Sequence, residues 1–194
     1  MARLTQSTVV QEPPFSRFLF NDIRTAPLWF LLRLYVGWAW LDAGLHKVQD
    51  PKWMDTGAAI KGFWANAVKT PPDVPRAPIT YDWYRGFLQF LSDAGAEVWF
   101  GKLIAVGEVV IGVALIVGLF TGFAALAGAF MNMNFMLAGT ASSNPVLLVL
   151  AVLILMAWKV AGIIGVDRFL LPLLGTPWRT GARAPSAKTA PAPA

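Results

Sequence analysis

Four long apolar stretches constrain this chain more than any other feature of its sequence. They cover about residues 27–45, 99–120, 121–139 and 146–166. A helix of about 20 residues crosses the roughly 30 Å hydrocarbon core of a bilayer. Hydrophobic residues make up 56% of the chain and charged residues only 14%, whereas average soluble domains carry roughly 25% charged residues. We therefore expect an integral membrane protein in which each stretch is one membrane-spanning helix.

The short connections between the later stretches predict how the helices are arranged. A tight Gly-Leu-Phe-Thr-Gly turn at residues 118–122 joins the second stretch to the third, and a short polar turn joins the third to the fourth. Connections this short place successive helices side by side and antiparallel. The fold class that we expect is an all-α integral membrane protein with an antiparallel bundle of four transmembrane helices.

The connection between the first and second stretches, residues 46–98, is much longer and rich in aromatic residues. Two groups of apolar residues at helical spacing lie on either side of a proline-rich break at residues 71–75. Short aromatic helices are typical of segments that lie at a membrane interface, so we expect a partly helical outer cap. The membrane domain then covers residues 27–172. Residues 1–26 form a polar N-terminal segment, and the Ala/Pro-rich tail at 173–194 is expected to be disordered.

The distribution of basic residues predicts the orientation of the chain. Loops on the cytoplasmic side carry an excess of Lys and Arg, and the two terminal segments hold slightly more of them than the loop at 46–98. We expect a multi-pass protein of the cell membrane with cytoplasmic termini and an extracytoplasmic loop. The net charge of +5 is not clustered, which argues against a nucleic-acid partner.

Redox metals are excluded by the residues that the chain lacks. It has no cysteine and a single histidine, His46. Iron–sulfur clusters, thiolate metal sites and bis-histidine haem therefore cannot be held by this chain alone, and we expect no metal site. If electrons pass through the protein, a bound organic molecule or a partner protein must carry them.

Arg33 and Glu108 are the strongest candidate site residues, because each lies inside an apolar stretch. Ionised side chains at such depth usually face the interior of a bundle and pair with one another. If the ends of the two antiparallel helices are level, the two side chains differ in depth by about 9 Å. We therefore expect an ion pair. This pair could bind a quinone carbonyl, an anion or a proton; alternatively, it is a structural clasp between the first two helices.

Glycines accompany both residues. Gly37 and Gly44 share a helical face with Arg33, and Gly112 lies one turn beyond Glu108. Small residues allow membrane helices to approach closely, so we expect these glycines to serve helix packing.

Three further polar residues have two interpretations each. Asp42 and His46 lie one turn apart near the outer end of the first stretch. A carboxylate beside a histidine can move protons near neutral pH, or the two can form an interfacial hydrogen bond. Asn132 in the third stretch is expected to bond to a neighbouring helix, with a contact to a bound cofactor as the alternative.

Four short motifs stand in a fixed order along the chain. They are Leu-Arg-Leu at 32–34, Asp-Ala-Gly-Leu-His-Lys at 42–47, Gly-Glu at 107–108 and Ala-Gly-Ile-Ile-Gly-Val-Asp-Arg at 161–168. Their order and spacing resemble the DoxX/DoxD family of small four-helix bacterial and archaeal membrane proteins. The long aromatic first loop is most similar to the DoxD branch, a membrane subunit of thiosulfate:quinone oxidoreductase.

The resemblance implies a quinone-linked subunit that oxidises thiosulfate to tetrathionate. Arg33 and Glu108 would then bind or protonate the quinone head, and Asp42 and His46 are secondary candidates. The main alternative is a non-catalytic subunit that anchors a larger complex through the bilayer, with a partner protein or a second copy as its neighbour. A transporter is disfavoured, because the polar positions are sparse and no pair of broken helices is evident.

Overall fold

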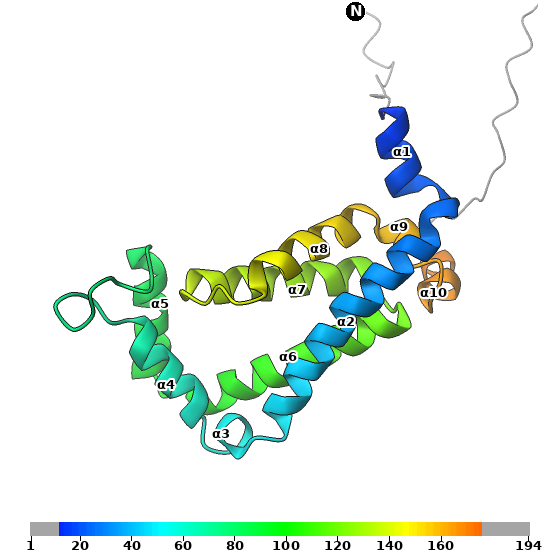
Figure 1. Ribbon diagram of the computed structural model, residues 1–194. Helices are drawn as coiled ribbons and strands as arrows, with labels where there is room; N and C mark the ends of the chain where they lie inside the picture. The colour runs from blue at the N-terminus through cyan, green and yellow to red at the C-terminus, as the bar shows by residue number, and fades with distance from the viewer. Residues whose placement is uncertain (1–11, 176–194) are drawn as a thin grey trace, which may run out of the picture.

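The computed structural model describes residues 12–175, which form helices joined by turns, with no strand among them (Figure 1). The all-helical prediction is therefore confirmed for this part of the chain, while most of the tail predicted to be disordered lies outside it. Two helix pairs make up the body of the molecule, since α2 packs mainly against α6, and α7 against α8. Their bounds are α2 Ala26–Val48, α6 Glu97–Val117, α7 Thr121–Leu137 and α8 Asn144–Met156.

Glycines bring the backbones of α2 and α6 into close contact. A Cβ atom on Gly112 would lie 2.5 Å from the backbone nitrogen of Leu41, and one on Gly44 would lie 2.7 Å from that of Val109. Gly37 makes a similarly close approach to α6. The packing role expected for these glycines is confirmed. The contacts also fix the register of the antiparallel pair, with Leu41 beside Gly112 and Gly44 beside Val109.

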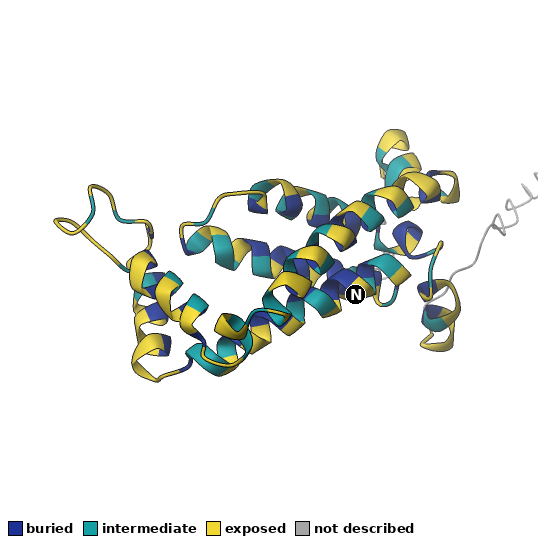
Figure 2. Cartoon of the chain, turned by 60° about the horizontal axis from the view of Figure 1, so that its bottom comes forward, coloured by how far each residue is buried: buried dark blue, intermediate teal, exposed yellow. Residues whose placement is uncertain are grey.

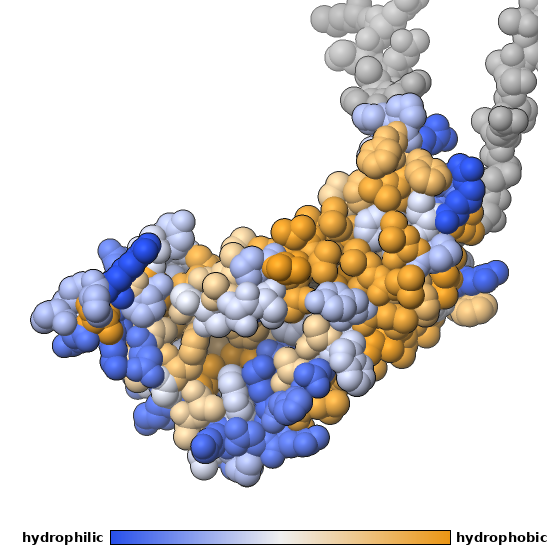
Figure 3. Space-filling model, in the orientation of Figure 1, coloured by the Kyte–Doolittle hydropathy of each residue, from blue (hydrophilic) through white to orange (hydrophobic). Residues whose placement is uncertain are grey.

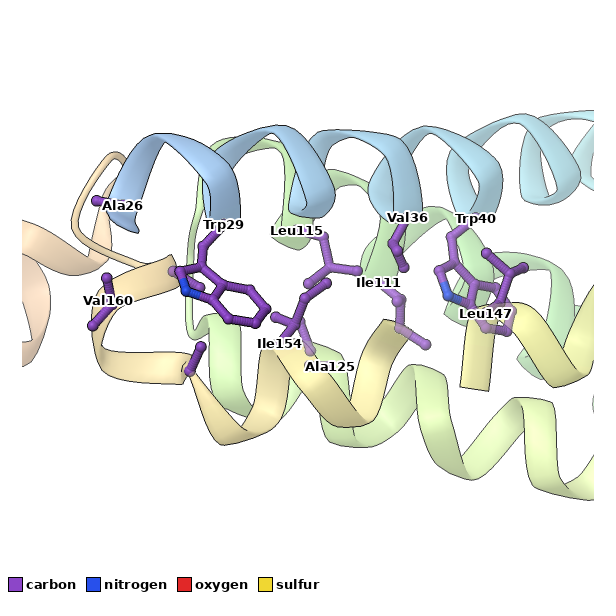
Figure 4. Close-up of a cluster of buried hydrophobic side chains, with 13 residues drawn as sticks. Ala26, Trp29, Val36, Trp40, Ile111, Leu115, Ala125, Leu147, Ile154 and Val160 are labelled. Carbon is purple, nitrogen blue, oxygen red and sulfur yellow. The ribbon is translucent and has the colours of Figure 1, made fainter. Parts of the chain in front are cut away.

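A hydrophobic core joins the two helix pairs. Trp29, Val36 and Trp40 extend from α2 into the interior of the bundle (Figure 4). They belong to the same buried cluster as Leu115 of α6 and Ile154 of α8. Because α2 contributes large side chains to this core along much of its length, it contacts α8 as well as α6.

The connection at residues 46–98 is a helical cap with its own core. Buried residues from the cap, among them Trp64 and Leu88, pack with Ile104 near the start of α6. The hydroxyl of Tyr84 donates a hydrogen bond of 3.0 Å to the carbonyl oxygen of Asn134 in α7. The cap therefore lies across the ends of both α6 and α7 (Figure 1). Its helices are α3 Pro51–Met54, α4 Ala58–Ala67 and α5 Asp82–Asp93.

Short helices gather at the opposite end, called here the terminus end. They are α1 Pro14–Asn21, η1 Ile23–Thr25, α9 Trp158–Ala161 and α10 Asp167–Leu173. The first of these helices lies in the segment at 1–26 that was predicted to be polar. In the structure, α1 presents apolar side chains to the core. Leu19 and Phe20 pack on the bundle, and the indole N–H of Trp29 donates to the carbonyl of Leu19 at 2.8 Å.

The fourth apolar stretch is not the single helix that was predicted. α8 ends at Met156, and only the short α9 follows before the chain turns at residues 162–166. The backbone N–H of Asp167 donates to the carbonyl of Gly118 at 2.8 Å, so the chain returns to the turn between α6 and α7. A straight helix would carry Asp167 past this turn.

The helix lengths also differ from the four equal spans that were predicted. Within residues 12–175, α6 is the one helix both long and apolar enough to cross a membrane by itself. α7 has 17 residues and α8 has 13. α2 has 23 residues, but it carries Arg33, Asp42 and Lys47 along its length.

Apolar side chains cover much of the outside of the bundle. Large exposed residues line the outer faces of α6, α7 and α8, including Val110, Phe123, Phe130 and Val149. On the face shown in Figure 3, hydrophobic surface dominates the bundle, whereas polar surface dominates the cap. Figure 2 shows exposed residues along the outward sides of the same helices. Apolar surface of this extent is typical of proteins that contact lipid or another protein.

The α2–α6 contact predicts opposite outcomes for two glycines of the same helix. Gly112→Ala should lower the free energy of unfolding by about 1–3 kcal/mol, because its methyl group would overlap the backbone of Leu41. Gly107→Ala is the matched control, since its Cβ would meet the Met131 sulfur at an ordinary 3.7 Å. It should be neutral or stabilising, because alanine favours a helix by about 1 kcal/mol over glycine. Thermal unfolding in detergent measures both, and equal midpoints would contradict the close contact.

Candidate functional site

Glu108, in the middle of α6, is buried and forms an ion pair with Lys47 near the end of α2. Lys47 Nζ lies 2.6 Å from Glu108 Oε2. The Glu108 side chain is 1% exposed and that of Lys47 is 22% exposed, so the pair reaches from the interior to the surface. Lys47 Nζ also lies 5.3 Å from the ring centroid of Trp53 in the cap. Gly44 leaves room for the pair, because a Cβ there would lie 3.0 Å from Glu108 Cβ.

The predicted ion pair between Arg33 and Glu108 is wrong. Gly44 lies beside Glu108 and follows Arg33 by eleven residues, which is about 16 Å along a helix. The prediction assumed that the ends of the two helices are level. The glycine contacts instead let the start of α2 project about ten residues, or about 15 Å, beyond the end of α6. Arg33 lies on this projecting part.

Arg33 is fully buried at the terminus end, where two glycines enclose its guanidinium. Its Nη2 donates a hydrogen bond of 2.5 Å to the carbonyl oxygen of Ile164. A Cβ on Gly118 would lie 1.7 Å from Arg33 Nη1, and one on Gly165 would lie 2.7 Å from it. The guanidinium also lies in the field of the Asp167 carboxylate. We call this set, Arg33, Gly118, Gly165 and Asp167, the Arg33 clasp, because it ties α2 to two turns of the chain.

Asp167 caps α7 from a distance in the sequence. Its buried carboxylate accepts hydrogen bonds from the backbone N–H groups of Phe120, at 2.6 Å, and Thr121, at 2.7 Å. The first N–H groups of a helix have no partner within the helix, and a carboxylate there is also favoured by the helix dipole. This role of Asp167 was not predicted from the sequence. The available signal was an acidic residue directly after an apolar, glycine-rich segment.

Asp42 and His46 do not join either buried charge. His46 Nδ1 lies 2.8 Å from the Asp42 carbonyl oxygen and 3.7 Å from its carboxylate, and both side chains are more than half exposed. By helical periodicity they lie on the opposite face of α2 from Gly44. The contact of His46 at hydrogen-bond distance is with the backbone carbonyl of Asp42 and not with its carboxylate, so the side-chain hydrogen bond expected as one of their two interpretations is not made. A role for them beside Glu108 is not favoured by this placement.

Asn132 is buried in α7, but the hydrogen bond expected from it to a neighbouring helix is not made. Neither its amide nitrogen nor its amide oxygen has a hydrogen-bond partner among the described residues. The buried indole nitrogen of Trp40 is also without one. Native structures leave few buried polar groups unpaired, and each such group needs an explanation.

Two glycine contacts place these polar groups within about two helical turns of one another along the bundle. A Cβ on Gly107 would lie 3.7 Å from the Met131 sulfur, and because α6 and α7 run antiparallel, Glu108 and Asn132 each lie one residue from this contact, in opposite directions. A Cβ on Gly128, one turn from Asn132, would lie 3.0 Å from Trp40 Nε1. We define the inner polar layer as Trp40, Lys47, Glu108 and Asn132.

The inner polar layer combines two chemical capacities. The carboxylate–ammonium pair can hold and transfer a proton. The indole N–H and the amide can donate hydrogen bonds to a carbonyl oxygen, and the amide oxygen can accept one from a hydroxyl group. Among residues 12–175, no three His, Asp or Glu side chains gather in a way that could hold a metal ion. The groups of the inner polar layer could make hydrogen bonds with a molecule that carries carbonyl or hydroxyl oxygens.

Comparison with protein families matches residues 28–141 to the family described as DoxX. The chain belongs to the DoxX family. The matched region contains α2, the cap, α6 and α7, and therefore the whole inner polar layer. DoxX is a membrane family, which accounts for the apolar outer surface of the bundle. No curated protein and no solved structure matches the chain.

The capping role of Asp167 predicts a loss of stability in Asp167→Ala. The substitution leaves the N–H groups of Phe120 and Thr121 without their acceptor, and an unsatisfied buried group costs about 1–3 kcal/mol. Hydrogen exchange should also become faster in the first turn of α7. Asp93→Ala, at an exposed carboxylate at the end of α5, is the control and should change neither quantity. Unaltered exchange in Asp167→Ala would contradict the cap.

Proposed function

We propose that this DoxX protein is a quinone-linked, multi-pass membrane subunit whose quinone site is the inner polar layer. The observation that carries the proposal is the set of unpaired hydrogen-bonding groups on Trp40 and Asn132. The buried Lys47–Glu108 ion pair lies within about two helical turns of these groups along the bundle. In an apolar bundle such groups are costly unless they meet a polar ligand.

In this proposal the four long helices cross the membrane. α7 is about 26 Å long and α8 about 20 Å, so the bilayer would thin locally around these two helices from its usual hydrocarbon thickness of roughly 30 Å. The apolar outer faces of the bundle support this placement. Both ends of the described chain lie at the terminus end (Figure 1). We place that end at the cytoplasmic face of the cell membrane and the cap outside.

The proposed reaction would use both the hydrogen-bonding groups of the inner polar layer and its ion pair. A quinone accepts two electrons and two protons when it is reduced to a quinol. By the resemblance to the DoxD branch, the electrons come from two thiosulfate ions, which are oxidised to one tetrathionate. Trp40 and Asn132 would donate hydrogen bonds to the carbonyl oxygens of the ring, and the Asn132 amide oxygen would accept one from the quinol.

Glu108 and Lys47 would supply protons from the cap side. Glu108 is enclosed, whereas Lys47 is partly exposed and contacts Trp53 of the cap. A proton can therefore pass from the surface to the interior through the ion pair. Arg33, about 16 Å away along α2, acts in this proposal as a structural clasp.

The second candidate function is a non-catalytic anchor for a larger complex. The observation in its favour is that the Asp167 carboxylate caps α7 and that Arg33 Nη2 bonds the Ile164 carbonyl, although Arg33 Nε and Nη1 have no hydrogen-bond partner among the described residues. The exposed apolar faces of α6 and α7 would then pack against a partner protein or a second copy of the chain.

Glu108→Gln tests the quinone proposal. In membranes carrying the protein, thiosulfate-dependent quinone reduction should fall by about a hundredfold, because the amide cannot transfer the proton that the carboxylate does. Glu97→Gln is the matched control, since Glu97 begins the same helix and pairs at 3.2 Å with an exposed lysine, Lys61. The membranes carrying the wild type, Glu108→Gln and Glu97→Gln must contain equal amounts of the protein. Unchanged activity in Glu108→Gln would contradict the proposal.

A double variant separates loss of folding from loss of chemistry. Glu108→Gln alone leaves the Lys47 ammonium buried without its counter-charge, which is destabilising. Lys47→Met combined with Glu108→Gln removes both charges and should restore abundance but not activity. Recovery of activity in the double variant would assign the pair a structural role. If the wild type also shows no activity, the anchoring function is favoured, and Arg33→Ala should then lower the amount of assembled complex without changing its turnover.

A further inference from the structure

A second feature of the structure lies well away from the inner polar layer. A groove of ≈ 250 Å³ opens at the terminus end, beside the first turns of α7. Its walls are almost wholly apolar and come from three segments of the chain, the start of α7, the end of α8 with α9, and α10. The apolar lining includes Phe123, Leu126, Leu155, Trp158 and Leu171.

The groove has a polar end and an apolar end. Thr121 and Asp167 line it at the start of α7, whereas Leu126 lies five residues farther into the bundle, or about 7 Å along the helix. Thr121 is fully buried, and its hydroxyl has no hydrogen-bond partner among the described residues. A ligand that fits this groove therefore carries a polar group at one end and a hydrocarbon chain at the other.

Two basic residues flank the polar end. Lys159 is exposed, and its ammonium lies 5.7 Å from the ring centroid of Trp158, which lines the groove. Arg168 is exposed and shares a face of α10 with Leu171, three residues later. The neighbouring negative charge, that of Asp167, is already engaged by two backbone N–H groups. The flanks of the groove therefore attract an anion.

We propose that this groove binds one acyl chain of an anionic diacyl phospholipid, with the headgroup held between Lys159 and Arg168. The chain lies along Phe123 and Leu126 toward the middle of the bilayer, and the Thr121 hydroxyl donates to an oxygen of the ester or headgroup. Anionic lipids are concentrated in the cytoplasmic leaflet, which is where the proposed topology places this end. The inference rests on that membrane placement and is independent of the quinone reaction.

Photo-crosslinking in reconstituted vesicles tests the proposal. The full chain is placed in phosphatidylcholine vesicles that contain a diazirine-bearing phosphatidylglycerol, or a phosphatidylcholine with the same modified chain. Labelled peptides are identified by mass spectrometry. Phosphatidylglycerol should label the start of α7 and α10 more strongly than phosphatidylcholine does. Each basic residue near an anionic membrane surface contributes a factor of roughly five.

Substitutions test the polar end and the apolar end of the groove independently. Lys159→Gln combined with Arg168→Gln should reduce phosphatidylglycerol labelling to the level of phosphatidylcholine. Lys102→Gln is the matched control, because Lys102 is exposed near the cap end of α6 and should change nothing. Leu126→Trp fills the apolar end and should reduce labelling by both lipids, and its partial exposure lets the fold accept the larger side chain.

Three results would overturn the proposal. They are equal labelling by the two lipids, phosphatidylglycerol labelling that persists when both charges are removed, and crosslinks that join the groove to a second copy of the chain. None of these results depends on thiosulfate or quinone turnover. Failure of the lipid site and failure of the proposed reaction are therefore told apart.

Discussion

The close contact of α2 with α6 determines where the buried charges of Arg33 and Glu108 lie. Gly112 and Gly44 allow the two backbones to approach this closely, because a Cβ at either position would overlap the backbone of the facing helix. The register of this contact sets Lys47 beside Glu108. It also lets the start of α2 project beyond α6, where Arg33 meets the turns at Gly118 and Gly165. One packing constraint thus separates two charges that would otherwise pair.

The two charged groups are stabilised in different ways, and the difference bears on their roles. Glu108 has a flexible partner, Lys47, whose side chain is partly exposed. Arg33 has a rigid environment of a carbonyl oxygen, glycine backbone and the field of Asp167. A guanidinium does not lose its proton in proteins, so Arg33 holds the fold together while the Glu108 pair remains able to react.

The sequence predicts the parts of this structure that depend on composition and periodicity. The helical class, the packing role of Gly112 and the burial of Arg33 and Glu108 all follow from residue type and apolar pattern. The partners of those two charges do not follow from the sequence in this way. They depend on the register between α2 and α6, which the apolar pattern of each helix does not determine. Lys47 was missed as a site residue because it lies just outside the first apolar stretch, and Asp167 because its hydrogen bonds join residues far apart in the sequence.

The bundle has buried polar groups near both the terminus end and the cap end, but these groups differ in how far they are enclosed. At the terminus end, Arg33 is fully buried and glycine backbone encloses its guanidinium. At the cap end, the partly exposed Lys47 pairs with the buried Glu108, and farther inside the bundle Trp40 and Asn132 have hydrogen-bonding groups without a partner among the described residues. A bundle built only to anchor a complex would be more stable with apolar side chains at those two positions. Their presence favours a ligand that enters the layer over a purely structural function.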